Sequence, residues 1–342
     1  MKNKIYSLLF VSIALLSACS TKLDVTGSYK ETMVVYGLLD QSQPKQYIKI
    51  NKAFLGEGNA FTYAKIKDST QYVNALTVKL KRLSDNTEYT LTPDNSIQKS
   101  PGTFYGPDQT NAIYSFNSTG PAALTAASNY ELTIKNSETG TQVSSQTSLI
   151  TDVNFNSPSP VVPAFGFLFA NNDNYEYQVR WTSGLNARLY QVVIRLNYID
   201  SLASGNVTQS LDWVFPELTT QSLAGGEDMK NDFVGQNFMR FIGNQLHDYT
   251  GLLARRALKV DLILIAGGDE LSTFIDVNKP STSIVQQKPI YTNITNGLGV
   301  FSSRYNKPPL SKFLAKTTWD SLACGRYTNS LKFLNSLGHV CQ

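Results

Sequence analysis

The stretch ALTVKLKRL, residues 75–83, shows the pattern that decides the fold. Leu76, Val78 and Leu80 alternate with threonine and lysine, so one face of the segment is apolar and the other is polar. An alternation with period two is typical of a half-buried β-strand. The same alternation recurs in YIKINKAFL (47–55) and NYELTIKN (129–136).

Turn-forming residues separate these strands. The segments LSDNTEY, TPDNS, SPGTFYGPDQTN and SETGTQ are rich in Gly, Pro, Asn and Asp. Short strands at this spacing predict a β-sandwich. We therefore expect an N-terminal β-sandwich over residues 31–150.

A second domain is expected over residues 151–310. Three prolines in NSPSPVVP (156–163) predict an extended linker at its start. The segments YEYQVRW (175–181) and YQVVIRLNY (190–198) then alternate as strands. A strand with a central Trp followed by a Tyr-x-Val-x-Ile strand resembles a fibronectin-type or immunoglobulin-like sandwich, an analogy at the level of the fold.

The second domain also contains helical patterns. Apolar residues at three- and four-residue steps predict an amphipathic helix over 227–243, with Asp228 and Asp232 near its positive end. Residues 258–266 read as a buried strand and 269–277 as a short helix capped by Asp269. Residues 311–342 are expected to form a C-terminal tail of short helical and loop pieces. The predicted class is thus mainly β: two sandwiches, the second with inserted helices.

The first 18 residues have the features of a secretory signal peptide. Lys2 and Lys4 precede an apolar run that is too short to cross a bilayer, which takes about 20 residues. The run ends in Leu16-Ser17-Ala18-Cys19, which resembles a bacterial lipobox. This resemblance implies cleavage before Cys19 and attachment of lipid to its thiol. The alternatives are a plain secretory signal with an incidental cysteine, or a short buried helix.

A lipid anchor has a clear physical consequence. Each buried CH₂ group contributes about 0.8 kcal/mol, so two or three acyl chains hold a protein on a membrane. Residues 19–30 are polar and are expected to form a tether. We expect a location at the outer membrane. In the bacterial phylum that this sequence resembles, lipoproteins sent to the cell surface often carry a run of acidic residues just after the cysteine. Lys22 and Asp24 are the only charges close to Cys19, so this resemblance favours the periplasmic face but leaves the cell surface open.

The composition limits the classes of partner and the cysteine chemistry that the sequence suggests. The 30 Lys and Arg and 26 Asp and Glu leave a formal charge of +4, two of which belong to the predicted leader. Such a nearly neutral chain does not imply a nucleic-acid partner. Cys324 and Cys341 remain after Cys19 and form an even pair, so we predict a disulfide between them in an oxidising compartment. This disulfide would close a loop of about 18 residues and would raise the free energy of unfolding by about 3 kcal/mol. The alternative is a catalytic or metal-binding cysteine.

Catalysis has little support in the sequence. His247 follows the predicted long helix in a polar stretch and His339 lies beside Cys341, and the sequence shows no nucleophile partner for either. No spacing of ligand residues matches a zinc or calcium site, so we predict no metal, no cofactor and no enzymatic activity. The motif AGGDEL (266–271) resembles the diguanylate cyclase signature, but an exported chain would not meet cytosolic GTP. We interpret it as a strand-to-helix turn.

Two kinds of surface site are possible. Phe165, Phe167 and Phe169 lie on one side of a segment at the domain boundary, either as an edge strand packed on the core or as an aromatic patch that binds a partner. Asp-Ser pairs at 68–69, 200–201 and 320–321 resemble the start of a bacterial O-glycosylation motif.

Residues 30–60, 267–304 and the lipobox together resemble a family of Bacteroidota outer-membrane lipoproteins of unknown function. NGLGVFSSR (296–304) is the segment most typical of it, and its glycines permit a tight bend before a strand. Members are often encoded beside TonB-dependent receptors, which implies a helper role in uptake or assembly. The resemblance supplies no catalytic residues.

The sequence thus predicts a non-catalytic, lipid-anchored binding or accessory module whose partner is a TonB-dependent receptor, another envelope protein or a glycan. A structural or adhesion protein without a small ligand is the alternative, and an envelope hydrolase is a third.

Overall fold

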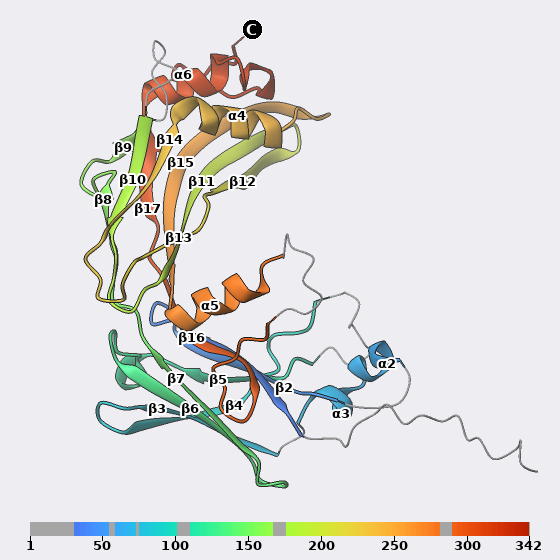
Figure 1. The fold of residues 1–342 in the computed structure, drawn as a ribbon. Helices are drawn as coiled ribbons and strands as arrows, with labels where there is room; N and C mark the ends of the chain where they lie inside the picture. The colour runs from blue at the N-terminus through green and yellow to red at the C-terminus, as the bar shows by residue number, and fades with distance from the viewer. Residues whose placement is uncertain are drawn as a thin grey trace, which may run out of the picture.

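The computed structural model describes residues 31–54, 59–72, 75–100, 110–166, 176–280 and 289–341. The protein is mainly β, as the alternating sequence predicts, and its core consists of two separate hydrophobic clusters. In Figure 1 the elements around the first cluster form the lower body and those around the second form the upper body. Among the described residues, no helix combines the length and apolar character needed to cross a bilayer.

The lower body is built largely from the N-terminal part of the chain. Its strands are β1 (Met33–Leu39), β2 (Lys45–Lys52), β3 (Leu76–Arg82), β4 (Thr87–Pro93), β5 (Ile113–Asn117), β6 (Asn129–Asn136) and β7 (Gln142–Ser148). Three short helices accompany them: α2 (Ala60–Ala64), α3 (Lys67–Thr70) and the 3-10 turn η1 (Gly120–Ala122). The strands follow the order β1-β2-β5-β4-β3-β6-β7, and all of these neighbours are antiparallel.

Two elements from late in the sequence complete the lower body. They are the helix α5 (Asp269–Asn278) and the strand β16 (Leu298–Asn306), and β16 pairs in parallel with β1. Phe301 of β16 and the preceding Ile294 are buried in the first cluster. Gly299 makes this pairing possible, because its φ is +112° and a Cβ there would lie 1.9 Å from the Val35 carbonyl oxygen. The predicted second domain includes these residues, whereas Ile294 and Phe301 pack in the first cluster and Tyr305 of β16 packs in the second.

The upper body holds the second cluster. Its strands are β8 (Asn154–Ser157), β9 (Ala164–Phe165), β10 (Glu176–Thr182), β11 (Leu189–Leu202), β12 (Gly205–Val214), β13 (Leu218–Thr219), β14 (Asp228–Val234), β15 (Leu252–Gly267) and β17 (Leu310–Leu314). Its helices are α4 (Gly235–Gln245), α6 (Lys316–Cys324) and the 3-10 turn η2 (Asn329–Leu331). A three-stranded sheet of β14, β10 and β8 stands beside the long strands β11 and β15.

The long strand β15 links the bodies. It pairs with β11 along its length, with β17 over Lys259–Leu262 and with β16 over Ile265–Gly267. Polar contacts reinforce the junction, since Lys307 Nζ pairs with the Asp152 carboxylate at 2.7 Å.

Two predictions of local structure need correction. The predicted helix over 227–243 is wrong in its first half, because residues 228–234 form β14 against β10. Met229, Asn231 and Phe233 are the buried positions there, which is a period of two, and only α4 is helical. Asp269 does not cap α5 either. Gly268 holds that position, and Asp269 lies in the first turn.

The predicted C-terminal tail contributes to the core. Leu314 of β17, Leu322 of α6, and Leu331 and Phe333 beyond it are buried in the second cluster. Cys324 and Cys341 form a disulfide with Cα atoms 5.2 Å apart, which ties the end of α6 to the last described residues.

Candidate functional site

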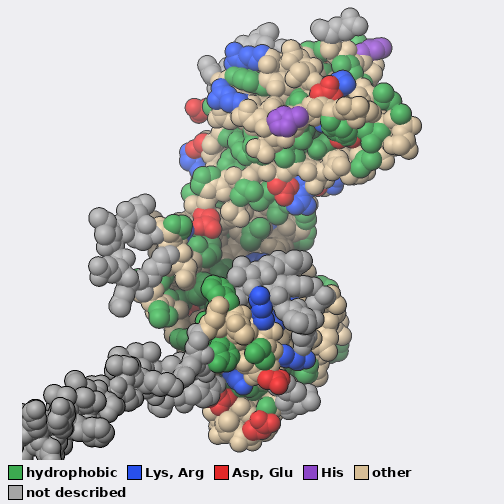
Figure 2. All heavy atoms as spheres, turned by 90° about the vertical axis from the view of Figure 1, so that its right-hand side faces the viewer, with side chains coloured by type: hydrophobic (Ala, Val, Ile, Leu, Met, Phe, Trp, Pro, Cys, Tyr) green, Lys and Arg blue, Asp and Glu red, His purple; other side chains and the backbone are tan. Residues whose placement is uncertain are grey.

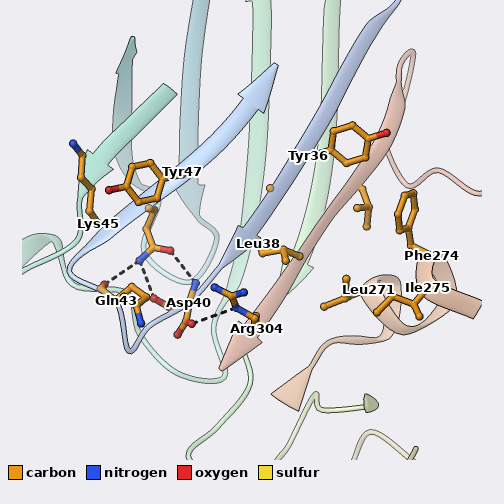
Figure 3. Close-up of a pocket in the computed structure, with 13 residues that line it drawn as sticks. Tyr36, Leu38, Asp40, Gln43, Lys45, Tyr47, Leu271, Phe274, Ile275 and Arg304 are labelled. Atoms are coloured by element: carbon orange, nitrogen blue, oxygen red, sulfur yellow. Dashed lines mark hydrogen bonds and ion pairs between the residues drawn. The ribbon is translucent and has the colours of Figure 1, made fainter. Parts of the chain in front are cut away.

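A well-defined hollow lies between α5 and the outer face of β1 and β2. It has a volume of about 530 Å³, and Figure 3 shows the side chains that line it. We call it the α5 groove. Its lining residues come from β1, the β1–β2 turn, β2, α5 and β16: Tyr36, Gly37, Leu38, Asp40, Gln43, Lys45, Gln46, Tyr47, Leu271, Phe274, Ile275, Val300 and Arg304.

The first turn of α5 fixes the helix on β16. The Ser302 hydroxyl accepts a hydrogen bond from the Leu271 backbone and donates one to the Glu270 carboxylate. Gly268 permits this contact, because a Cβ there would lie 2.8 Å from Ser302 Oγ. Arg188 of the upper body adds an ion pair to Asp269 at 2.8 Å. Residues of both bodies therefore bind α5, which forms one wall of the groove.

Apolar side chains line the wall and floor of the groove. Leu271, Phe274 and Ile275 have the spacing of one helical face and point towards β1. On β1, Val35 and Leu39 are buried in the core, so Tyr36 and Leu38 face the opposite side. The Tyr36 ring meets Phe274 edge-on, with centroids 6.1 Å apart.

Two tyrosines remain open to solvent at this apolar surface. Tyr36 is 42% exposed and Tyr47 of β2 is 38% exposed, although both are large side chains on otherwise well-packed strands. The Lys45 ammonium lies 5.6 Å from the centre of the Tyr47 ring, within the range of a cation–π contact. Aromatic side chains presented in this way are suited to contact with a partner.

The polar end of the groove is built on a closed network of hydrogen bonds. The buried Gln46 side chain donates to the backbone oxygen of Asp40 and to Ser118 Oγ, and it accepts from the Asp40 amide. The Asp40 carboxylate, itself 2% exposed, accepts from Ser42 and from Asn306. This network fixes the shape of the β1–β2 turn and leaves Gln46 little capacity for a ligand.

Two cationic side chains, Lys45 and Arg304, border this end, and they differ in the ion pairs and hydrogen bonds that they make. Lys45 forms a 2.6 Å ion pair with Asp94. This ion pair, together with hydrogen bonds from Ser96 and Ser115, lowers the pKa of Asp94. The same ion pair raises the pKa of Lys45. Arg304 Nε lies 3.6 Å from Asp40 Oδ2 and makes no hydrogen bond within the described residues. Figure 3 shows its guanidinium between Leu38 and Asp40, at the mouth of the groove.

The α5 groove contains titratable groups of three kinds. Its titratable groups are two tyrosines, one carboxylate and two cations, and it holds no thiol or imidazole. The two histidines of the chain belong to the upper body, where Figure 2 shows both purple side chains. Among the described residues, no group of three His, Cys, Asp or Glu side chains is placed to hold a metal ion.

A second hollow, of about 340 Å³, lies where the described chain begins. Burial favours the neutral form of Glu31, but hydrogen bonds from Thr139, Asn136 and Thr141 outweigh it and lower its pKa. These bonds tie the start of the chain to the β6–β7 turn. We interpret this hollow as a structural junction.

The structure separates the residues that the sequence singles out. Phe165 is partly buried against the second cluster and meets Tyr177 edge-on at 5.9 Å, as the edge-strand alternative predicts. Phe167, Phe169 and Cys19 lie outside the described residues. Of the Asp-Ser pairs, Ser321 is buried and bonded to the Thr317 carbonyl, and Asp200 is buried in an ion pair.

The α5 groove was not predicted from the sequence, although β1 carries one signal of it. The strand MVVYGLL places large apolar or aromatic residues on both faces, and a strand with one solvated face would alternate with polar residues. The helix that forms the opposite wall follows more than 200 residues later, so no local pattern joins the two.

Comparison with known proteins adds little. No family model matches the chain, and no curated protein matches it. Among solved structures, one match is a chain of a cytokine receptor complex, with 9% identity over 81% of this chain and 94% of that one, at a TM-score of 0.20. Another is a DUF4785 family protein from Legionella pneumophila subsp. pneumophila str. Philadelphia 1, with 12% identity over 65% of this chain and 48% of that one, at a TM-score of 0.19. Similarity at this level carries no functional argument.

Proposed function

We propose that this protein is a lipid-anchored, non-catalytic binding module of the bacterial outer membrane, and that the α5 groove is its binding site. In this proposal Cys19 carries the lipid, and the two bodies are sandwich-like domains. The resemblance of the lipobox and of residues 267–304 to Bacteroidota outer-membrane lipoproteins supports the location. The partner class that this resemblance favours is a TonB-dependent receptor or another protein of an envelope complex.

The α5 groove carries the proposal. It combines an apolar helix face, two solvent-exposed tyrosines and a guanidinium whose Nε lacks a hydrogen-bond partner within the described residues. Protein interfaces are enriched in tyrosine and arginine. Tyrosine buries a large area at a small cost in conformational entropy. The ligand we propose is a segment of a partner protein that places an apolar side chain near Tyr36 and Phe274 and a carboxylate at Arg304.

The site chemistry also supports a non-catalytic role. General acid–base catalysis at neutral pH relies most often on histidine, or on a carboxyl group with a raised pKa. The carboxylates beside the groove, Asp40 and Asp94, are both engaged in ion pairs, and the pKa of Asp94 is lowered rather than raised. These groups are arranged to hold the turn in place.

The location is tested by labelling cells with palmitate. The wild-type chain is expected to incorporate label and to sediment with membranes, and Cys19→Ala is expected to do neither. Globomycin should cause an uncleaved precursor to accumulate. Unchanged membrane attachment of Cys19→Ala without label in the wild type would refute the anchor while leaving the groove untested.

The binding site is tested by affinity purification from native membranes of the source organism. The wild-type chain should recover an envelope receptor in near-stoichiometric amount, and Tyr36→Ala combined with Tyr47→Ala should lose it. Leu253→Ala is the matched control, because Leu253 is an exposed apolar residue of the upper body. Equal recovery by all three chains would exclude the groove. Recovery of no partner by the wild type would favour the alternative of a structural or adhesion protein.

A further inference from the structure

The strand β12 forms an open edge of the sheet in the upper body. It ends the strand order β12-β11-β15-β16, and it pairs with β11 through a hairpin whose turn is Ala203 and Ser204. Figure 1 shows β12 at the rim of the upper body, beside β11. Residues 203–210 are all exposed, so the outer half of the strand is open on its faces as well as along its edge.

The register shows which backbone groups of β12 face the open edge. The Phe215 amide donates to the Val192 carbonyl, which makes this opposed pair a hydrogen-bonded one. Hydrogen-bonded and non-bonded pairs alternate along antiparallel strands. The odd-numbered residues of β12 therefore bond to β11. The even-numbered residues Asn206, Thr208, Ser210, Asp212 and Val214 direct their N–H and C=O groups outwards, away from β11.

Other sheet edges in the described residues are protected. β14 carries charged side chains at Asp228, Lys230 and Asp232, and β8 has only four residues. The edge of β7 is covered at Ser144, whose amide and carbonyl both bond to Thr295. Such charges, short strands and covering segments are the usual means by which proteins prevent edge-to-edge pairing.

β12 lacks these protections. Its sequence GNVTQSLDWV contains no lysine, no arginine and no proline. Its single charge, Asp212, is held by two hydrogen bonds from the Arg195 guanidinium at 2.6 and 2.8 Å. A long, uncharged open edge of this kind is a template for another strand.

We propose that β12 pairs with β12 of a second copy of this chain, antiparallel, about a two-fold axis at Gln209. This centre places Asn206 opposite Asp212 and Thr208 opposite Ser210, whereas a centre at Ser210 would place Asn206 opposite the apolar Val214. The two sheets would become continuous. No like charges oppose each other in this register, and the Asn206 amide of each copy can donate to the Asp212 carboxylate of the other.

This self-complementarity is the reason for choosing a second copy as the occupant. A different protein would need its own matching strand, whereas β12 already supplies polar partners for its four polar outward-facing residues. A single strand pair is smaller than a standard interface, so pairing is expected to be weak in dilute solution. Pairing should be stronger where copies are confined together.

A cysteine at the axis tests the proposal. In the full-length chain, Gln209→Cys places two Cα atoms opposite each other in a non-bonded pair, about 4.5 Å apart and within disulfide range. Thr208→Cys is the matched control, because the two copies of residue 208 would be offset along the strands and lie about 8 Å apart. The double variant T208C/S210C restores an opposed pair and should cross-link again.

The readout is the fraction of disulfide-linked dimer after mild oxidation of membranes and of purified chain, with wild type as the baseline for the native cysteines. Q209C is expected to give about tenfold more dimer than T208C, because a Cα separation above 7 Å prevents bridging. Adding Ser210→Pro to Q209C should reduce the dimer, since it removes an outward N–H group and spares the bonds to β11. Equal cross-linking of Q209C and T208C, cross-linking of Q209C to a different protein, or no dimer above baseline would each overturn the proposal.

Discussion

Arg255 and Asp200 face each other on neighbouring strands as a buried ion pair. Arg255 Nε lies 3.0 Å from Asp200 Oδ1, and the two side chains are 2% and 5% exposed. The remaining guanidinium nitrogens donate to the backbone oxygens of Leu331 and His247. One side chain therefore joins β11 and β15 to the C-terminal segment.

Removing Arg255 should be costly, because it leaves the Asp200 carboxylate buried without its partner cation. We expect Arg255→Met to lower the free energy of unfolding by about 3–5 kcal/mol, measured by urea denaturation. The control is Arg195→Met, which breaks the exposed pair with Asp212 and should cost about 1 kcal/mol or less. Similar losses in the two variants would show that burial does not set the importance of the pair.

The disulfide between Cys324 and Cys341 should stabilise the end of the chain. Replacing both cysteines by serine is expected to lower the free energy of unfolding by about 2–4 kcal/mol, because the unfolded chain loses its constraint. Dithiothreitol should destabilise the wild type by a similar amount and leave the double variant unchanged. A double variant as stable as the oxidised wild type would contradict a stabilising role.

Gly299 should be intolerant of any side chain. Gly299→Ala combines an unfavourable φ of +112° with a Cβ placed against the Val35 backbone, so β1 and β16 could not pair as observed. We expect a loss of at least about 3 kcal/mol in the free energy of unfolding. Gly338→Ala shares the positive φ, at +83°, but its Cβ would meet nothing within 4 Å. It should cost about 1 kcal/mol, and a comparable loss at both glycines would exclude close approach as the cause.

The ion pair between Lys45 and Asp94 should make stability depend on pH in acid. The pKa of Asp94 is lower in the folded protein than its usual value of 3.8, so the folded state favours the ionised carboxylate. The resulting stabilisation is fully present above the unfolded pKa and is lost as the pH falls through the folded pKa. Denaturation midpoints from pH 6 to pH 2 should therefore fall less steeply for Asp94→Asn than for the wild type. Parallel profiles would rule out Asp94 as a contributor.

The strands could be predicted because their alternation is local. Val78 and Leu80 point into the first cluster as their spacing requires, and the buried run near Leu262 is part of β15. The segment 228–234 shows where this reasoning fails. It fits a helical pattern and an alternating pattern equally well in isolation, and its pairing with β10 decides between them.

The α5 groove could not be predicted in the same way. Its tyrosines lie on β1 and β2, whereas Phe274 and Arg304 come from α5 and β16, far along the chain. These side chains come together because β1 pairs in parallel with β16. The hydrophobic pattern of neither strand indicates which strand it pairs with. The disulfide between Cys324 and Cys341 could be predicted, because the assignment of Cys19 to a lipid leaves two cysteines, which allow a single connection.

The placement of β16 beside β1 has a consequence for biogenesis. Val34 near the start of the described chain pairs with Leu298, so the lower body lacks a strand until the chain has been synthesised beyond residue 298. Contacts between such distant positions form slowly, because a long loop must close first. A nascent chain built in this way stays incompletely folded for most of its synthesis, which is the state in which a polypeptide can be threaded through a translocation channel.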